Sequence, residues 1–402
     1  MTSVAIFTTY APSEGFGGPS RTYHQRRVLE DAGYDVTHVV IQAAADRGNL
    51  RSHDIRELVE RPYRAPIDHI YSDVDLGARA AADQRVVDRV TSRLRAMNVS
   101  ALVLEQPFLI ATVEQVAKAL DVPVLYSCQN IEYRLRRDLE RFQPDPHRPR
   151  DRSVEVYELE QRAAQLSAAI TTICPYDQEQ LESHFGRTST LVPNGSEVAE
   201  TDVATRRPRT ADGTRFSFAG SAYWPNVEGF VEIATPSLAF LPPTTRIDVA
   251  GSVGGEIMRC QPIVRHQSAN ASRITVHGFV PMARLVELMS SSDAVIVPVF
   301  IGEGSNLKTA DALASGAPVI MSQRALRGYE DVVEADPGGV TVVETAQEFR
   351  HAMRTVVENG RPAAVVGEHR RALLTWSKRL APLVAVMDEM SGTRRMPTAT
   401  AP

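Results

Sequence analysis

The feature that most constrains the fold is a strand, a glycine loop and a helix expected in direct succession. Residues 294 to 300 form an apolar run rich in β-branched side chains, which suits a strand buried on both faces of a parallel sheet. Gly302 and Gly304 follow this run, and helix-forming residues follow the glycines. Gly316 and Pro318 then predict the end of the helix and the start of another strand.

This succession predicts an anion site. A helix that begins beside a glycine loop presents free backbone N–H groups, and it can be capped by Ser305 or Asn306 and joined by the charge of Lys308. Glu303 and Asp311 lie eight positions apart, so on a helix they point about 80° apart and can line one site. Their oxygens could accept hydrogen bonds from hydroxyls on either side of a diphosphate. The alternative is one solvated loop acid and one ordinary helix acid.

Bulk properties exclude several classes. The chain has 402 residues, enough for two domains, and a net charge of −5, which argues against a nucleic-acid partner. Cys128, Cys174 and Cys260 are widely spaced and offer no disulfide or zinc framework. No segment approaches about 18 consecutive apolar residues, and the first residues lack a basic region. We therefore expect a cytoplasmic protein.

The first residues also predict a strand and a glycine loop. Residues 4 to 8 form a short β-rich run that leads to Gly17 and Gly18, and a helix is expected over residues 20 to 31. The loop is not G-x-G-x-x-G, and no acid follows at the position that binds a ribose in NAD-dependent enzymes. The glycines predict either a ligand-facing loop or a tight turn only.

The remainder of the first half alternates strands and helices. A helix is expected over residues 81 to 97, and no firm pattern is found between residues 43 and 79. Asp73 and Asp75 form a D-x-D pair, a short pattern that occurs in metal sites but also in ordinary turns. The basic, proline-broken segment 134 to 152 predicts a mobile acceptor-binding loop. Further strands are expected at 36–41, 101–104, 122–127 and 169–173, with helices at 154–167 and 176–184.

The second half begins after a polar segment, residues 197 to 215, which lacks large apolar side chains and predicts a linker. Residues 216 to 219 predict its first strand, and Trp224 and Asn226 precede a helix expected over residues 227 to 234. Further strands are expected at 246–250, 274–276 and 340–343, with helices at 281–290, 346–359, 361–374 and 380–390.

The spacing Glu303-x7-Asp311, followed by Ala-Leu-Ala-Ser-Gly-Ala-Pro-Val-Ile, resembles the E-x7-E signature of the family 4 retaining, nucleotide-sugar-dependent glycosyltransferases, which are of the group 1 type. Asp311 stands where the family has its second Glu. The resemblance implies that Glu303 contacts the transferred sugar, that Asp311 holds the donor ribose and that Lys308 neutralises the diphosphate. It also implies catalytic roles for Glu303 and Lys308.

Other segments are similar to the same family. The Gly17-Gly18 loop resembles the one that faces the donor diphosphate across the interdomain cleft. Gln129-Asn130 resembles an H-N-x-E segment, with Gln129 in place of His as a candidate catalytic residue. The Trp-Pro-Asn sequence resembles that of a subgroup with its positive charge in a later helix, and Val280 matches a base contact. The remaining implied donor-binding residues are Ser221, Trp224, Asn226, Gly304, Ser305, Asn306 and Leu307.

The resemblance implies the α/β GT-B fold, with two Rossmann-like doubly wound domains facing a cleft. The expected organisation is an acceptor-binding domain (residues 1–196), a linker (197–215), a nucleotide-sugar-binding domain (216–375), a helix returning to the first domain (376–392) and a disordered tail (393–402). The implied reaction moves a sugar from an NDP-sugar, with a UDP-, GDP- or dTDP-linked donor, to an acceptor hydroxyl with retention, without a metal, a cofactor or a nominated general base.

Two alternatives remain open at the level of sequence. A GT-B-fold epimerase would act on the NDP-sugar itself, and a non-catalytic protein would bind the sugar nucleotide without turning it over. The acceptor could be a small molecule, a lipid-linked sugar or a polysaccharide. Association with a membrane surface is a weaker expectation that rests on the basic segment 134 to 152.

Overall fold

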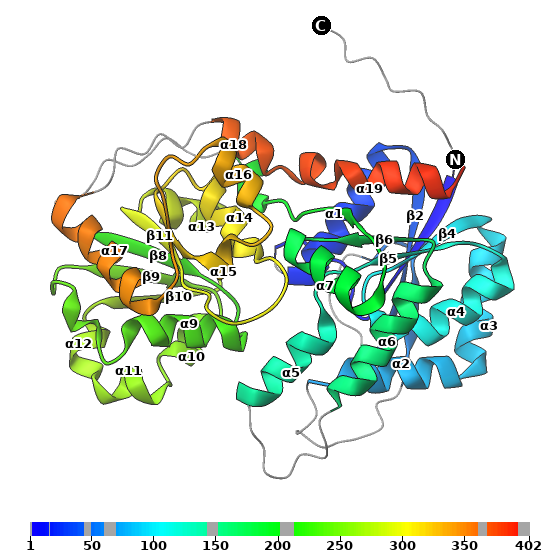
Figure 1. The fold of residues 1–402 in the computed structure, drawn as a ribbon, viewed down its shortest axis with the longest axis horizontal. Helices are drawn as coiled ribbons and strands as arrows, with labels where there is room; N and C mark the ends of the chain where they lie inside the picture. Colours follow the sequence, from blue (N-terminus) through cyan, green and yellow to red (C-terminus); the bar gives the residue numbers. More distant parts are fainter. Residues whose placement is uncertain are drawn as a thin grey trace, which may run out of the picture. The chain divides into compact units, whose positions relative to one another are not determined.

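The fold is seen in a computed structural model, which describes residues 2–15, 17–43, 50–59, 70–142, 152–201, 213–360 and 368–392. The chain divides into two compact units (Figure 1). The first is Met1–Val192 together with Leu380–Pro402, and the second is Pro193–Arg379. Each unit is built on its own parallel β-sheet.

The first unit contains a seven-stranded parallel sheet in the order β3-β2-β1-β4-β5-β6-β7. Its strands are β1 (Thr2–Thr8), β2 (Tyr34–Gln42), β3 (Ile55–Leu58), β4 (Val99–Leu104), β5 (Val124–Ser127), β6 (Ala169–Thr172) and β7 (Thr190–Leu191). Its helices are α1 (Gly17–Asp31), α2 (Ser72–Ala82), α3 (Gln84–Ala96), α4 (Ile110–Leu120), α5 (Glu132–Phe142), α6 (Ser153–Leu166) and α7 (Pro175–Phe185), with a 3-10 turn, η1 (Pro107–Leu109). The unit is completed by α19 (Trp376–Met390) from Leu380 onward.

The second unit contains a six-stranded parallel sheet in the order β10-β9-β8-β11-β12-β13. Its strands are β8 (Arg215–Ala219), β9 (Arg246–Ala250), β10 (Ile274–Gly278), β11 (Ala294–Val297), β12 (Val319–Ser322) and β13 (Val340–Val343). Its helices are α8 (Glu197–Glu200), α9 (Trp224–Ala234), α10 (Val253–Ile257), α11 (Gln261–Arg265), α12 (Gln267–Ala271), α13 (Met282–Ser290), α14 (Leu307–Ala314), α15 (Gln323–Leu326), α16 (Glu330–Ala335), α17 (Ala346–Asn359) and α18 (Glu368–Leu373), with a 3-10 turn, η2 (Leu238–Phe240).

The β11 strand shows why its sequence is apolar throughout. Ala294 and Ile296 belong to a core that also contains residues of α9, α10 and α17, whereas Val295 and Val297 belong to a core with residues of α13 and α14. Successive side chains of a strand point to opposite faces, so both faces are buried. Figure 1 shows the two groups of helices on opposite sides of this sheet. The expected fold class, with two doubly wound α/β units, is confirmed.

Several element boundaries differ from the sequence prediction. The expected helix over residues 81 to 97 is divided into α2 and α3 at Asp83, whose carboxylate accepts a hydrogen bond from the Arg85 amide (3.0 Å) and caps α3. The segment without a firm pattern contributes β3 and part of α2. On β3, Ile55 pairs with Val39 of the neighbouring strand, a contact that the local sequence does not reveal.

Part of the expected acceptor loop is a helix. α5 covers residues 132 to 142, while residues 143 to 151 lie outside the described part of the chain. The buried carboxylate of Glu160 accepts the backbone N–H groups of Glu132 (2.7 Å) and Tyr133 (2.9 Å) and so satisfies the first turn of α5. An acid almost thirty positions away in the sequence therefore fixes the start of this helix.

The two acids of the D-x-D pair, at positions 73 and 75, are engaged in ion pairs within the first unit. Both lie in the first turn of α2. Asp73 pairs with Arg136 at 3.4 Å, and Asp75 pairs with Arg152 at 2.8 Å. The acids therefore join α2 to the α5–α6 region, and two arginines of the basic segment are used in ion pairs within the unit.

Part of the segment expected as a linker is a helix. Residues 197 to 200 form α8, whose Val198 is fully buried in the core of the second unit, so the polar composition of this segment concealed a packed turn. The division between units lies at residue 193 rather than 197. Residues 202 to 212, in the expected linker, and residues 393 to 402, the expected tail, lie outside the described part of the chain.

Candidate active site

The centre of the second sheet is where its strand order reverses. Chain connections run outward in one direction from β8 and in the other from β11, and these two strands are neighbours. Ligands of open α/β sheets bind at such a point, beyond the carboxyl ends of the strands. The two loops that meet there carry Ser221 and the segment from Glu303 to Lys308, which the sequence had singled out.

Two glycines allow the parts of this site to approach closely. A Cβ atom on Gly229 of α9 would lie 1.8 Å from the Pro298 carbonyl oxygen, beyond the end of β11. A Cβ atom on Gly251 would lie 2.1 Å from the carbonyl oxygen of Gly220, and Gly251 has φ of +91°. Only glycine fits either position, so these residues set how closely the strand-end loops and α9 pack.

Lys308 joins the first turn of α14 to the first turn of α9. Its Nζ donates hydrogen bonds to Oδ1 of Asn226 and, at 3.4 Å, to Oδ1 of Asn306. Nδ2 of Asn226 in turn donates to the Ser221 carbonyl oxygen at 3.0 Å. Desolvation by burial lowers the pKa of Lys308 to about 7. Among the residues that the structure describes, no acidic side chain takes part in these hydrogen bonds, so an incoming anion would provide the charge opposite to that of the Lys308 ammonium.

The start of α14 adds backbone donors to the same place. Asn306 is its N-cap, and its side chain makes no capping hydrogen bond. The first N–H groups of a helix have no intrahelical acceptor, and they carry the positive end of the helix dipole. Ser305 is fixed just before the helix, because Nδ2 of Asn194 donates to its Oγ at 2.8 Å. Lys308 and Leu307 lie in the first turn of α14, so the charged side chain and the free backbone amides belong to the same end of the helix.

Glu303 lies in the loop before α14 and is almost fully buried, with 2 % of its side chain exposed. Its neighbours Gly302 and Gly304 have φ of +111° and +70°, conformations that favour glycine. Two arginines beyond β12 lie close to the carboxylate. Nη1 of Arg324 is 3.9 Å from Oε1, and Nη1 of Arg327 is 3.6 Å from Oε2.

Asp311, the second acid of the motif, is buried in α14 and accepts a hydrogen bond from Ser196 Oγ at 2.7 Å. Burial raises its pKa to about 7, while Ser196 and the backbone amides of Glu197 and Val198 act in the opposite direction. Asp311 therefore interacts with the start of α8 within the second unit. This packing role was not evident from the sequence, where the residue was assigned only to a ribose.

The remaining residues expected at the donor have different surroundings. Trp224 is half-buried in the first turn of α9, which begins three residues earlier than expected, and Asn226 belongs to the same turn. Pro225 at the second helical position accounts for the earlier start, because its fixed φ favours the first turn. Val280 is half-buried against the core of the second unit, beside the 72 % exposed Phe279.

The first sheet reverses its strand order between β1 and β4, and the second group of expected residues lies there. Gly17 and Gly18 form the first turn of α1 rather than a loop before it. A Cβ atom on Gly18 would lie 2.6 Å from the Tyr10 hydroxyl and 3.1 Å from Oε1 of Gln129. Gln129 follows β5, and the side chain of the adjacent Asn130 donates to Glu132 at 3.1 Å.

Glu105 is the residue of this group that the sequence analysis did not select. It is fully buried directly after β4, and its Oε2 accepts hydrogen bonds from Nε2 of Gln129 and from Thr22 Oγ1 (3.0 Å). Nε2 of Gln129 also donates to the Tyr10 hydroxyl at 3.2 Å. Burial raises the pKa of Glu105, and the charge of Arg21 opposes that shift. Its position at the carboxyl end of a predicted strand was the available signal.

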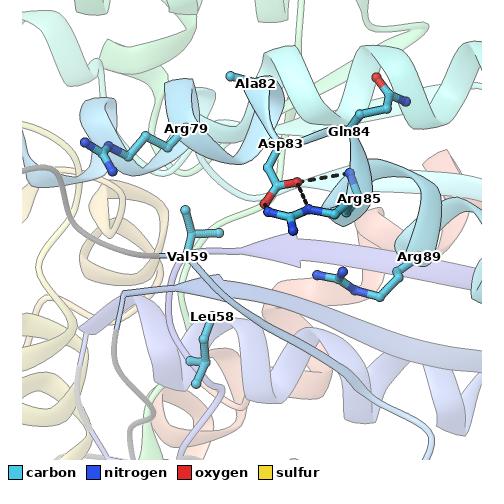
Figure 2. A pocket seen from close by; sticks show the side chains of 8 residues that line it. All are labelled: Leu58, Val59, Arg79, Ala82, Asp83, Gln84, Arg85 and Arg89. Atoms are coloured by element: carbon cyan, nitrogen blue, oxygen red, sulfur yellow. Dashed lines mark hydrogen bonds and ion pairs between the residues drawn. The ribbon is translucent and has the colours of Figure 1, made fainter.

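A hollow of about 840 Å³ lies elsewhere in the first unit, beside the edge strand β3 and the junction of α2 and α3 (Figure 2). Two of the three arginines that line it, Arg85 and Arg89, are engaged in ion pairs. Arg85 bonds to Asp83, as Figure 2 shows, and Arg89 lies 2.6 Å from a Glu57 oxygen. None of the residues that the sequence analysis selected lines it, and we do not assign it to the site.

Two searches of the described residues found nothing. Among them, no group of three or more His, Cys, Asp or Glu side chains is placed to hold a metal ion. No helix in the same parts of the chain is long and apolar enough to cross a membrane.

Comparisons with known proteins agree with this geometry. Residues 213–359 match the family model described as Glycosyl transferases group 1. This segment contains the whole strand-order reversal of the second unit. No curated protein sequence matches the chain.

Solved structures are similar over both units. Sucrose-phosphate synthase from Thermosynechococcus elongatus has a TM-score of 0.73 at 14 % identity, and the match covers 98 % of this chain and 100 % of that one. HepE from Anabaena, solved in complex with UDP, has a TM-score of 0.66 at 13 % identity, with 97 % and 100 % covered. WaaG, a glycosyltransferase involved in lipopolysaccharide biosynthesis, has a TM-score of 0.62 at 14 % identity, with 96 % of each chain covered.

At these identities the structural matches establish the fold, while the family match carries the chemistry of the second unit. The match includes the segment from Glu303 to Asp311 on which the resemblance was based, so the predicted resemblance to group 1 glycosyltransferases is confirmed. Together, the group 1 match over residues 213–359 and the shared fold of both units identify the chain as a glycosyltransferase of GT-B type.

Proposed function

We propose that the protein transfers a sugar from an NDP-sugar to an acceptor hydroxyl, with retention of the anomeric configuration and without a metal ion. The observation that carries this proposal is the joint position of Lys308 and the start of α14, with Glu303 in the same loop. A positive site that adjoins a buried carboxylate fits a diphosphate bonded to a polyhydroxylated group.

The second unit then binds the donor. Lys308 and the first N–H groups of α14 hold the diphosphate and stabilise it as it leaves. Glu303 accepts hydrogen bonds from hydroxyls of the transferred sugar, and Asp311 from the ribose. Val280 and the α9 start, with Trp224, are the proposed surroundings of the base. HepE is described in complex with UDP and with UDP-glucose, which supports a UDP-linked donor as the first to test.

The proposal of a metal-independent reaction rests on the positive groups that the protein itself provides for the diphosphate. In many phosphoryl sites a divalent ion neutralises the diphosphate, and here a lysine ammonium and helix amides can take that role. Because desolvation disfavours the charge on Lys308, binding a diphosphate relieves an unfavourable state of the free protein. The proposal therefore assigns no metal ligand.

The first unit supplies the acceptor side. Gln129 and Asn130 lie beside Gly18 at the strand-order reversal of its sheet, where such folds bind ligands. Because Nε2 of Gln129 donates to Glu105 and Tyr10, its Oε1 is the atom suited to accept a hydrogen bond from an acceptor hydroxyl. The resemblance implies that a donor phosphate oxygen takes the acceptor proton, so we assign no general base.

The test is a thermal-shift panel of nucleoside diphosphates and NDP-sugars, because a ligand bound only by the folded state raises its stability. The panel is run on wild type, Glu303→Ala and the control Glu256→Ala, which removes an acid 45 % exposed on α10. We expect one diphosphate to stabilise all three proteins. Its sugar conjugate should stabilise wild type and Glu256→Ala further, but should give no additional stability to Glu303→Ala. Stabilisation by none of the compounds would contradict the proposal.

Turnover separates transfer from the other two activities compatible with sugar-nucleotide binding. The NDP-sugar selected by the panel is incubated without acceptor and followed by NMR. Slow release of the diphosphate, with water as the acceptor, supports a transferase. Conversion to an isomeric NDP-sugar would indicate an epimerase, and complete stability of the bound compound would indicate a binding protein.

A further inference from the structure

The surroundings of Glu303 contain two cations that the glycosyltransferase motif does not include. Arg324 and Arg327 come from the segment after β12, outside the motif, and both guanidinium groups lie within 4 Å of the Glu303 carboxylate. Arg327 is 17 % exposed at its side chain and Arg324 is 32 % exposed. A buried carboxylate is costly unless it is paired, so these positive charges stabilise its ionised form.

The segment that carries the arginines is fixed to the loop that carries Glu303. Arg324 Nη1 donates to the Gly302 carbonyl oxygen at 2.5 Å. Ser322, the last residue of β12, caps α15 by accepting the Ala325 amide (3.2 Å) and also donates its hydroxyl to the carbonyl oxygen of Val299. The segment that carries the arginines is therefore attached to the part of the loop that precedes Glu303.

Arg327 itself lies in a tight turn. It has φ −49° and ψ 125°, Gly328 has φ +83°, and the Tyr329 amide donates to the Leu326 carbonyl oxygen at 2.9 Å. These values describe a type II turn with glycine at its third position. The buried Arg379 donates to the Gly328 carbonyl oxygen at 2.6 Å and holds the turn in place. Other L-residues fit the second position of such a turn, so Arg327 can be replaced without backbone strain.

We propose that Arg327, supported by Arg324, is a positioning residue that holds the Glu303 carboxylate ionised and oriented toward the sugar of the donor. This inference rests on the proposed function and adds a residue to it. The arginines act on recognition of the sugar through Glu303 and make no contact with the diphosphate, which Lys308 and α14 bind. Their positive charges also offset the negative charge of Glu303, which would otherwise repel a diphosphate bound at the same loop.

The test measures the affinities of UDP and UDP-glucose, or of the pair that the thermal-shift panel selects, by isothermal titration calorimetry. Arg327→Met keeps the apolar stem and removes the charge, and Arg327→Lys keeps a charge. Arg284→Met is the matched control, because Arg284 forms an exposed pair with Glu287 on α13 of the same unit. Each variant is first checked for an unchanged cooperative thermal transition.

We expect the ratio of the UDP-glucose and UDP dissociation constants to rise at least tenfold in Arg327→Met, with UDP affinity within threefold of wild type. Arg327→Lys should recover most of the ratio, and Arg284→Met should leave it unchanged. Combining Arg327→Met with Glu303→Gln should add nothing to Glu303→Gln alone, because the arginine acts through that carboxylate.

Three results would overturn the inference while leaving the proposed function in place. They are an unchanged ratio in Arg327→Met, an equal loss of UDP and UDP-glucose affinity, which would place Arg327 at the diphosphate, and additive effects in the double variant. Failure of wild type to bind any nucleotide is a different result, which would contradict the proposed function itself and this inference with it.

Discussion

Replacing Lys308 with methionine should stabilise the free protein and weaken diphosphate binding. Burial lowers the pKa of Lys308 from 10.5 to about 7, so the fold disfavours its charged form. The unfolded chain then binds more protons than the folded chain between these values, and stability rises with pH from about 7 to 10.5. The penalty is fully present below pH 7 and disappears above 10.5.

The size of this effect follows from the shift. A pKa unit is worth about 1.4 kcal/mol, so the full shift corresponds to about 5 kcal/mol. Lys308 retains partial contact with solvent and donates to Asn226, so the expected gain is smaller. We expect Lys308→Met to raise the free energy of unfolding by about 2 kcal/mol at pH 7 in urea titrations. Lys118→Met, which removes an exposed ammonium from α4, should change it little.

Binding provides a second reading of the same group. If a diphosphate restores the charge of Lys308, binding at pH 8 should take up about 0.9 proton per site, since a group with a pKa near 7 is about one tenth protonated there. Calorimetry in two buffers of different ionisation enthalpy measures this number. Uptake should vanish in Lys308→Met and persist in Lys118→Met. Absence of uptake in wild type, or its persistence in Lys308→Met, would refute the assignment of Lys308 to the diphosphate.

Three further changes test the packing around the two sites. Gly229→Ala places a methyl group against the Pro298 carbonyl and should cost more than 2 kcal/mol in urea unfolding and weaken UDP binding, whereas Gly255→Ala, which meets nothing within 4 Å, should do neither. Burial raises the pKa of Asp311 to about 7, so the contribution of this residue to the free energy of unfolding falls as pH rises from 4 to 7. The difference in free energy of unfolding between Asp311→Asn and wild type should therefore shift in favour of the variant between pH 5 and pH 8. Glu160→Ala leaves two buried amides of α5 without their acceptor and should cost about 3 kcal/mol, with Glu160→Gln less harmful; equal effects would contradict the capping role.

The local sequence was sufficient to predict features that depend on a single strand, loop or helix. The alternation of apolar runs with glycine loops and helices predicted both parallel sheets. The strand, loop and helix around Glu303 were found within a few residues of their observed bounds. These signals are local because strand burial, glycine φ and helix capping depend on neighbours in the chain.

Errors arose where distant residues decide the local structure. α5 was predicted as a loop, because its first turn depends on the carboxylate of Glu160, which belongs to α6. α8 was predicted as linker, because only its packing beside α14 buries Val198. Asp83 divides a region whose apolar pattern favours one continuous helix.

The sequence by itself determined the family resemblance, the two α/β sheets and the acid–lysine motif of the proposed donor site, since each is encoded in contiguous residues. Only the tertiary structure decided which groups surround that motif. Arg324 and Arg327 approach Glu303 from beyond another strand, and Ser196 approaches Asp311 from before α8. Sequence spacing cannot reveal these contacts, because a parallel sheet brings the ends of non-consecutive strands to one edge and lets distant side chains set the charge of a site.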